Sequence, residues 1–394
     1  MDHIRERAAA YQADMVEFRR DLHRHPELSL QEKRTTDRIA EELDKLGIAY
    51  KRFEPTGLMA DIVGGVPAKK ADGTVPCVAL RADIDALPMT EQSGVEFASE
   101  TPGVMHSCGH DTHAAMLLGA VKVINDIKEQ MAGKVRFIFQ PAEENAEGAR
   151  LAIAQGCLEG VDRIYGIHIA GGEPAGKVIP QKGTTAAAAD MFRVVIKGKA
   201  AHGAAPQFGV DATVCAAAVI LELQTLVSRE LSPFDAVVVT VGQVHSGTRF
   251  NIISGEAVLE GTCRTLSRAV KNKLPDLFCR KVEGIASAYG CEVEIDYKSI
   301  TDTLVNDPEG MEIAAAAGRK ITGSDDIVPQ VVLSMGSEDF SEYTAVIPGA
   351  FSKLGGGGEY AVHSDKFVVD ESCFQVGAAL HVQTALDTLA LLVK

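Results

Sequence analysis

The pattern of apolar and polar positions divides the chain into short buried strands and amphipathic helices. Apolar runs such as KVRFIFQ and RIYGIHI have the length and bounds of buried strands. Segment 112–128 has apolar residues at helical spacing, so it predicts an amphipathic helix between such strands. This succession of strand, helix and strand predicts β-α-β units of a mostly parallel sheet.

The same reading predicts further elements on both sides of this region. Pro26 is expected to end a first helix, and Ser29 is expected to cap the next one. A strand is expected around Val331, and residues 355–358 are expected to form a flexible glycine loop. The further helices are expected over residues 4–24, 31–46, 147–158, 211–228, 266–288, 308–321 and 371–391.

The pattern changes in the middle of the chain, after the Gly- and Pro-rich stretch GGEPAGKVIPQKG. From there the predicted order is strand, helix, strand, strand, helix, strand, which is the ferredoxin-like βαββαβ arrangement. We therefore expect an α/β fold, with a mixed and mostly parallel sheet flanked by helices. Its catalytic domain would consist of residues 1–181 and 300–394, with an inserted domain over residues 182–299.

Composition narrows the class of protein. The chain has 394 residues, of which 46% are hydrophobic and 24% charged, which is typical of a soluble protein with a large core. The net charge of -15 without a run of Lys and Arg argues against nucleic acid as a partner. The apolar stretches are interrupted by charges, and the eight cysteines lack framework spacing. We therefore expect no membrane span and a cytoplasmic location.

The stretch MHSCGHDTHAAM concentrates the candidate chemistry. Cys108 and His110 are separated by Gly109, so a turning backbone can direct both side chains to one point. A thiolate beside an imidazole suits zinc and related transition metals. The alternative is a small buried cysteine and a turn histidine without a metal.

Three later segments could complete a metal site. Glu143 and Glu144 follow the strand that ends near Gln140, while His168 and His363 lie near the ends of other apolar runs. Because ligands of α/β sheets gather at the carboxyl ends of strands, these residues can converge there. One glutamate could bind metal while its neighbour takes a proton from a water molecule. The alternative for the glutamate pair is a solvated acidic loop.

Asp83 and Asp85 follow another buried strand and are expected at the same edge of the sheet. One of these carboxylates could orient a ligating histidine. A salt bridge between one of them and Arg81 is the alternative role. His106 and His113 are expected to support the site or to pack, without binding metal.

These motifs together resemble the metal-dependent N-acyl-amino-acid amidohydrolases, a family of the carboxypeptidase and aminoacylase clan that includes hippurate and indole-acetyl-amino-acid hydrolases. The resemblance runs through FRRDLHRHPELS, LRADIDALP, MHSCGHDTH, FQPAEE, GIHI, GKAAHGAAP, SEDF and HSD. It implies a zinc-peptidase-like catalytic domain with two divalent ions, which could be zinc, manganese, cobalt or nickel. It further implies metal ligation by Cys108, His110, Glu144, His168 and His363, with Glu143 as general base and acid.

The resemblance also gives expectations for the inserted domain. It implies that His202 stabilises the oxyanion of the tetrahedral intermediate and that this domain is a lid and a dimer interface. From the residues alone, His202 could equally be a turn histidine that caps a helix. Asn251 and Arg264 are candidates for binding a substrate carboxylate, although solvated strands also carry such residues. Asp111 is a further candidate for supporting the metal ligands or the substrate.

The expected function is hydrolysis of the amide bond of small N-acyl-L-amino acids to a carboxylic acid and a free amino acid. The acyl group could be acetyl, benzoyl or aryl-acetyl, and the enzyme is expected to be a homodimer or homotetramer. One alternative is a dipeptidase or aminopeptidase on the same scaffold. The other is a non-catalytic metal-bound sensor or binding protein.

Overall fold

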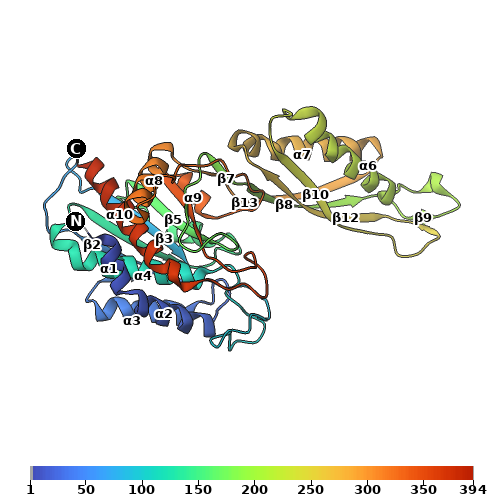
Figure 1. Cartoon of the computed structure of the whole chain (residues 1–394). Helices are drawn as coiled ribbons and strands as arrows, with labels where there is room; N and C mark the ends of the chain where they lie inside the picture. The colour runs from blue at the N-terminus through green and yellow to red at the C-terminus, as the bar shows by residue number, and fades with distance from the viewer. Residues whose placement is uncertain (1–2, 394) are drawn as a thin grey trace. The chain divides into compact units, whose positions relative to one another are not determined.

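A computed structural model describes residues 3–393 of the chain (Figure 1). These residues divide into two compact units, which are described separately. The first unit consists of residues 1–183, 305–332 and 342–394, and the second of residues 184–304 and 333–341. The first unit is thus formed by segments from both ends of the chain.

A seven-stranded sheet forms the centre of the first unit, in the order β1-β2-β4-β3-β5-β15-β6. Its four central strands, β4, β3, β5 and β15, run parallel, while the edge strands pair antiparallel. The mixed, mostly parallel α/β sheet predicted from the sequence is therefore confirmed. The strands are β1 (Tyr50–Arg52), β2 (Leu58–Val63), β3 (Cys77–Asp83), β4 (Lys134–Gln140), β5 (Arg163–Ala170), β6 (Val178–Ile179) and β15 (Gly349–Gly355).

Helices flank this sheet. α4 and α10 pack against each other and against β3, α8 packs on α10 and β15, and α2 packs on α4 (Figure 1). The helices of this part are α1 (Ile4–Ala10), α2 (Gln12–Arg24), α3 (Lys33–Lys45), α4 (His110–Ile127), α5 (Gly148–Ala154), α8 (Pro308–Thr322), α9 (Phe340–Thr344) and α10 (Phe374–Leu392), with short 3-10 turns at Lys128–Gln130 and Glu371–Cys373.

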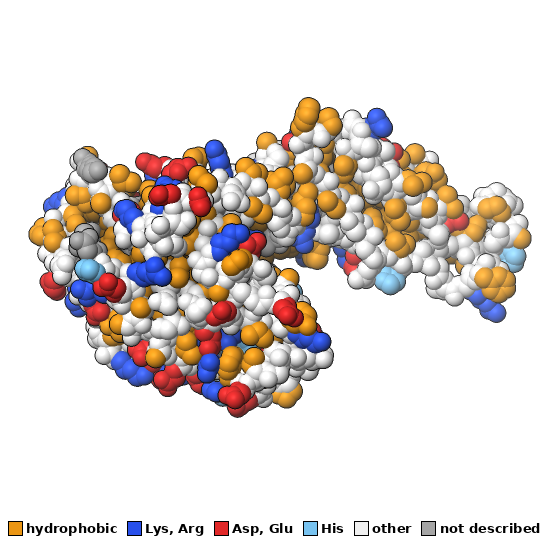
Figure 2. Space-filling model, viewed as in Figure 1, with side chains coloured by type: hydrophobic (Ala, Val, Ile, Leu, Met, Phe, Trp, Pro, Cys, Tyr) orange, Lys and Arg blue, Asp and Glu red, His pale blue; other side chains and the backbone are white. Residues whose placement is uncertain are grey.

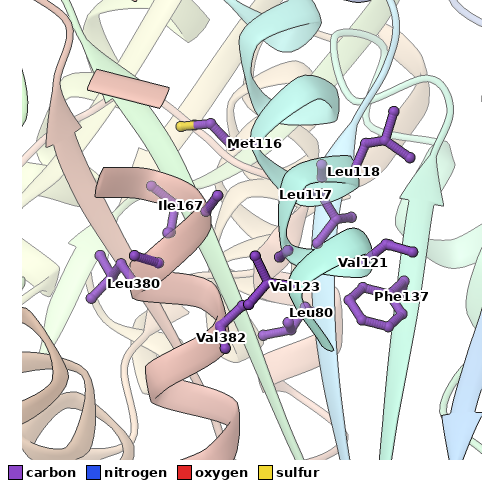
Figure 3. Packing of buried hydrophobic residues seen from close by; sticks show 14 of the residues in the cluster. Leu80, Met116, Leu117, Leu118, Val121, Val123, Phe137, Ile167, Leu380 and Val382 are labelled. Atoms are coloured by element: carbon purple, nitrogen blue, oxygen red, sulfur yellow. The ribbon is translucent and has the colours of Figure 1, made fainter. Parts of the chain in front are cut away.

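The core of the first unit lies between the sheet and these helices. Leu80 of β3 and Phe137 of β4 face Leu117 and Val121 of α4, and Val382 of α10 closes the same layer (Figure 3). All of these side chains are buried. Burial of large apolar side chains is worth roughly 1.5–3 kcal/mol each, so this layer fixes the sheet against α4. α4, which begins at His110, is thereby held against the sheet.

Several expected elements differ in detail. The helix expected over residues 4–24 is interrupted at Tyr11, and the strand expected around Val331 is wrong, because only an isolated bridge forms at Gln330. Ser29 does not cap α3, because the helix begins at Lys33 with Glu32 at the N-cap position, and the Ser29 hydroxyl donates to Asp85. β15 was not expected from the sequence at all.

The second unit contains a four-stranded antiparallel sheet in the order β10-β12-β8-β13, with α6 and α7 packed on it. Along the chain these elements follow the order β-α-β-β-α-β. A two-stranded ribbon of β9 and β11 lies apart from that sheet. The bounds are β7 (Thr184–Ala186), β8 (Ala188–Lys197), β9 (Ala201–His202), α6 (Ala212–Thr225), β10 (Val237–Ser246), β11 (Ile252–Ile253), β12 (Glu256–Thr265), α7 (Arg268–Ala288), β13 (Glu292–Thr301) and β14 (Leu304–Val305), with short helical turns at Pro206–Phe208 and Leu226–Glu230.

Two surface properties bear on the expected partners. On the face shown in Figure 2, basic and acidic side chains are interspersed rather than gathered into a basic stripe. Among the described residues, one helical stretch, 212–230, is long and apolar enough to cross a membrane by composition. Its buried side chains, which include Cys215, Val219 and Leu223, pack in the core of the second unit.

Candidate metal centre and catalytic site

The candidate ligands of the first unit meet at the carboxyl ends of its parallel strands. They come from the turn before α4, the first residue of α4, the loop after β4, the end of β5 and the loop that follows β15. This is the edge of an α/β sheet where ligand sites form. The residues gathered there are Cys108, His110, Glu143, Glu144, His168 and His363.

Gly109 allows Cys108 and His110 to point to the same place. Its φ of 87° lies in the left-handed region, which side chains disfavour. A Cβ at this position would also lie 2.5 Å from Ile169 Cγ2 on β5. Glycine is therefore required both for the turn and for its close approach to the sheet.

Cys108 is shared by two groups of potential ligands. The first group consists of Cys108, His110 and His168, and the second of Cys108, Glu144 and His363. Within each group, the potential ligand atoms all lie within 4.8 Å of one another. Cys108 Sγ lies 3.4 Å from His168 Nε2 and 3.3 Å from His363 Nε2. Two ions placed in these groups would share the cysteine sulfur.

Hydrogen bonds set the orientation of the histidine rings. His110 Nδ1 lies 2.9 Å from the carbonyl oxygen of Asp85, and His168 Nδ1 lies 2.6 Å from the carbonyl oxygen of Ile169. A carbonyl only accepts, so both Nδ1 atoms carry a proton, and the neutral form of each ring presents the lone pair of Nε2 to the site. Burial opposes the charged form of His110, but the nearby Asp83 carboxylate raises its pKa well above the usual range, so a metal ion would have to displace a proton from this ring. Burial lowers the pKa of His168 well below its usual range, so this ring is in the neutral form that binds metal.

These residues fit divalent metal ions. Among the residues described, His110 Nε2 and Glu144 Oε1 are buried without a hydrogen-bond partner, and they lie 3.8 Å apart. Ligand atoms of one tetrahedral zinc ion lie about 3.3–3.8 Å apart, given zinc–ligand distances near 2.0–2.3 Å. Burial raises the pKa of Cys108 to about 12, so a thiolate at this position needs a bound cation. The donor set of sulfur, imidazole and carboxylate suits zinc and the neighbouring transition metals.

Asp85 supports ligands of both groups. Its Oδ1 lies 3.1 Å from His110 Nδ1, and its Oδ2 accepts a hydrogen bond of 3.1 Å from the backbone N–H of Glu144. The Ser29 hydroxyl donates to the same Oδ2 at 2.7 Å. Asp85 is 1% exposed, so solvent does not replace these bonds. Its carboxylate thus couples the orientation of one ligand to the backbone of another.

Asp83 lies behind the site and holds a second histidine. It accepts from Arg81 Nη1 at 2.6 Å and from His113 Nδ1 at 2.5 Å. His113 Nε2 accepts the backbone N–H of Ile169 at 2.8 Å, so the expectation that His113 is a supporting or packing residue agrees with its contacts. The possible salt bridge between Asp83 and Arg81 is present, and it coexists with the contact to His113.

Asp111 faces α2. Its Oδ2 lies 2.7 Å from Arg19 Nε and 2.7 Å from His23 Nδ1. Burial alone would raise the pKa of Asp111, but Arg19 and His23 lower it, so the carboxylate is ionised. His23 also lies 3.1 Å from Glu91 in the loop before Cys108. Arg19 was not expected to take part in this network, although a buried acid at a helix start suggests a nearby cation.

The predicted residues of the second unit lie on its strands and on its β9–β11 ribbon. His202 of β9 pairs with Ile252 of β11, and its Nδ1 accepts the backbone N–H of Ala204 at 3.1 Å. The carbonyl of Asn251 accepts the N–H of Gly203 at 2.8 Å, which places Asn251 beside His202. Arg264 lies on β12 and donates to the Ser337 hydroxyl at 2.9 Å. Their roles in binding or catalysis stay predictions.

Glu143 adjoins the ligand groups. Its Oε2 lies 4.0 Å from His110 Nε2, and these two residues form a further potential metal group with Glu144. A carboxylate at this position can exchange a proton with a water molecule in the site. A carboxylate beside groups that can bind metal is the arrangement suited to metal-dependent hydrolysis.

Comparisons with known proteins agree with this kind of chemistry. The chain belongs to Peptidase family M20/M25/M40, whose family model matches residues 79–387. It is 38% identical to thermostable carboxypeptidase 2 of Saccharolobus solfataricus, over 94% of each chain. It is 37% identical to an N-acetylcysteine deacetylase of Bacillus subtilis, over 96% of this chain and 98% of that protein. A solved Bacillus subtilis structure, described as a dinuclear metal binding peptidase of the M20 family, has a TM-score of 0.82 at 34% identity and covers 97% of this chain and 99% of its own.

Proposed function

We propose that the protein hydrolyses small N-acyl-L-amino acids, with an N-acetyl, N-benzoyl or aryl-acetyl group, to a carboxylic acid and a free amino acid. The observation that carries the proposal is the pair of ligand groups that share Cys108, with Glu143 beside them. The similarity to an N-acetylcysteine deacetylase supports an acylated amino acid as substrate.

We propose that Cys108, His110, Glu144, His168 and His363 hold two divalent ions, with zinc, manganese, cobalt and nickel as candidates. The chemistry that such ions supply is the acidification of a water molecule and the polarisation of the amide carbonyl. Asp85 and the backbone carbonyls that bind the Nδ1 atoms keep the histidines in their ligating orientation.

In this proposal Glu143 moves the proton. It accepts a proton from the attacking water and then donates it to the nitrogen of the departing amine. His202 is proposed to stabilise the oxyanion of the tetrahedral intermediate, and Asn251 and Arg264 to bind the substrate carboxylate. We further propose a homodimer or homotetramer. A cytoplasmic location is proposed because a thiolate ligand would be lost to oxidation elsewhere.

A second candidate is carboxypeptidase activity, which the similarity to the Saccharolobus protein favours. Both activities release an amino acid with a free carboxylate, so they differ only in what lies on the acyl side of the bond.

The test is release of free amino acid from N-acetyl, N-benzoyl and indole-acetyl amino acids and from N-blocked and free dipeptides. Each substrate is assayed with chelator and after metal is restored. We expect chelator-sensitive release from the N-acyl compounds. Preference for the N-blocked dipeptides would favour the carboxypeptidase, and a requirement for a free α-amino group would favour a dipeptidase or aminopeptidase. Metal binding without any turnover would support a sensor.

A further inference from the structure

Residues 29–32 form the end of the connection between α2 and α3. They contact the loop that carries Glu143 and Glu144. This loop, residues 141–144, is called the PAEE loop here. Ser29 is the last residue of the motif FRRDLHRHPELS, and Glu32 follows it by three positions.

Glu32 makes the first of these contacts. Its Oε1 accepts a hydrogen bond of 2.9 Å from the backbone N–H of Ala142, inside the PAEE loop. Its Oε2 accepts from the Thr56 hydroxyl at 2.6 Å. Glu32 is 0% exposed, so water does not compete for either bond. A buried carboxylate therefore holds the residue that precedes Glu143.

Ala142 has a backbone conformation that needs such support. Its φ is 55°, in the left-handed region that residues with a Cβ rarely adopt. Its carbonyl accepts the N–H of Gly148 at 3.0 Å, so both polar backbone groups of Ala142 are bonded. The direction in which the chain enters Glu143 follows from this conformation.

Ser29 supports the other end of the loop through Asp85. The Ser29 hydroxyl donates to Asp85 Oδ2 at 2.7 Å, and the same oxygen accepts the N–H of Glu144. Two carboxylates thus hold the loop, Glu32 before Glu143 and Asp85 after it. Both are connected to the short segment 29–32.

We propose that Glu32 is a positioning residue that fixes the backbone at Ala142 and thereby directs Glu143 toward the reacting water. This inference rests on the proposed role of Glu143 as general base. Glu32 itself touches neither substrate nor metal in this account.

A role in helix stability alone does not explain Glu32. It occupies the N-cap position of α3, yet its side chain makes no capping hydrogen bond there. Burial raises the pKa of Glu32 to about 6, so the carboxylate is held in an unfavourable environment. The side chain of Glu32 therefore does not stabilise α3 by capping it. Its hydrogen bond to Ala142 holds the PAEE loop instead.

The experiment compares Glu32→Gln with Glu32→Asp. Gln keeps the length and the oxygen that accepts from Ala142 but removes the charge, whereas Asp keeps the charge and withdraws the oxygen by about 1.5 Å. We expect Glu32→Asp to lower kcat by about ten- to hundredfold with KM little changed, because small displacements of a catalytic group have effects of this size. Glu32→Gln is expected to stay close to wild type. Gln31→Ala, an exposed neighbour, is the matched control.

A second readout is independent of activity. Hydrogen exchange of the Ala142 amide should accelerate in Glu32→Asp and stay slow in Glu32→Gln, with circular dichroism and Tm measured to establish folding. The inference is overturned if the two variants lose activity equally while folded, or if Glu32→Asp matches wild type. An inactive wild type on every amide tested would instead refute the proposed function, so the two failures are distinguishable.

Discussion

Replacement of Asp85 by Ala should weaken metal binding at both ligand groups. One oxygen of the carboxylate accepts from His110 Nδ1. The other accepts from the Glu144 N–H and the Ser29 hydroxyl. His110 keeps its bond to the carbonyl of residue 85, whereas the Glu144 N–H and the Ser29 hydroxyl lose their acceptor. Both donors are only partly buried, so water can replace the lost acceptor, and each lost hydrogen bond costs about 0.5–1.5 kcal/mol, or about 1–3 kcal/mol in all.

Part of that loss should appear in metal affinity. Removing a group that orients metal ligands typically costs 10- to 100-fold in affinity, which corresponds to about 1.4–2.7 kcal/mol. The assay is competition with a chelator of known affinity, for each ion separately where the steps resolve. Asp61→Asn is the control, since Asp61 pairs with Arg136 and Lys134 on the sheet and contacts no candidate ligand. If a folded Asp85→Ala protein bound metal with wild-type affinity, Asp85 would not support the metal ligands as these distances indicate.

Four further results are expected. Glu143→Gln should keep its metal content, measured by elemental analysis, and lose hydrolysis by about 10²–10⁴-fold or more. Cys108→Ala should lower metal content below that of wild type, and unchanged stoichiometry would exclude the shared sulfur. His202→Ala should lower kcat by about 10²–10³-fold if it stabilises the oxyanion, and unchanged turnover would remove that role. Although burial opposes it, Arg136 and Lys134 lower the pKa of Asp61, so its ionised form stabilises the fold above about pH 4. The Tm difference between wild type and Asp61→Asn should therefore be present at pH 7 and disappear as the pH falls through that lowered pKa.

The sequence predicts the central elements of the fold well, and for a physical reason. β4 and β5 are rich in apolar residues and mostly buried, because central strands of such a sheet are covered on both faces. α4 has the helical spacing of a helix that packs on a sheet. β15 has neither signal, because its sequence GAFSKLG begins and ends with glycine and contains Ser352 and Lys353, so it resembles a loop. Only pairing with β5 on one side and β6 on the other stabilises it as a strand.

The supporting residues of the site depend on contacts that local patterns do not contain. Ser29 and Asp85 are 56 residues apart, and Glu32 and Ala142 are 110 apart. A serine ahead of a predicted helix fits an N-cap by local rules, and that expectation is wrong because α3 begins only at Lys33, with Glu32 at the N-cap position. By contrast, Glu143, Glu144 and His168 could be expected near one another in advance, because they lie beside apolar runs predicted as strands, and strand ends of a parallel sheet meet.

The geometry of the site also links metal binding to folding. Among the described residues, His110 Nε2 and Glu144 Oε1 are buried without a hydrogen-bond partner, although charged groups lie within 4 Å of both, and each such atom costs free energy. Burial keeps the Cys108 thiol protonated, with its pKa raised to about 12. A bound cation would give His110 Nε2 and Glu144 Oε1 a partner, which offsets the free energy needed to remove the thiol proton. Metal should therefore raise Tm in proportion to the logarithm of its concentration above Kd, and this increment should be lost in Cys108→Ala even if the apo protein folds normally.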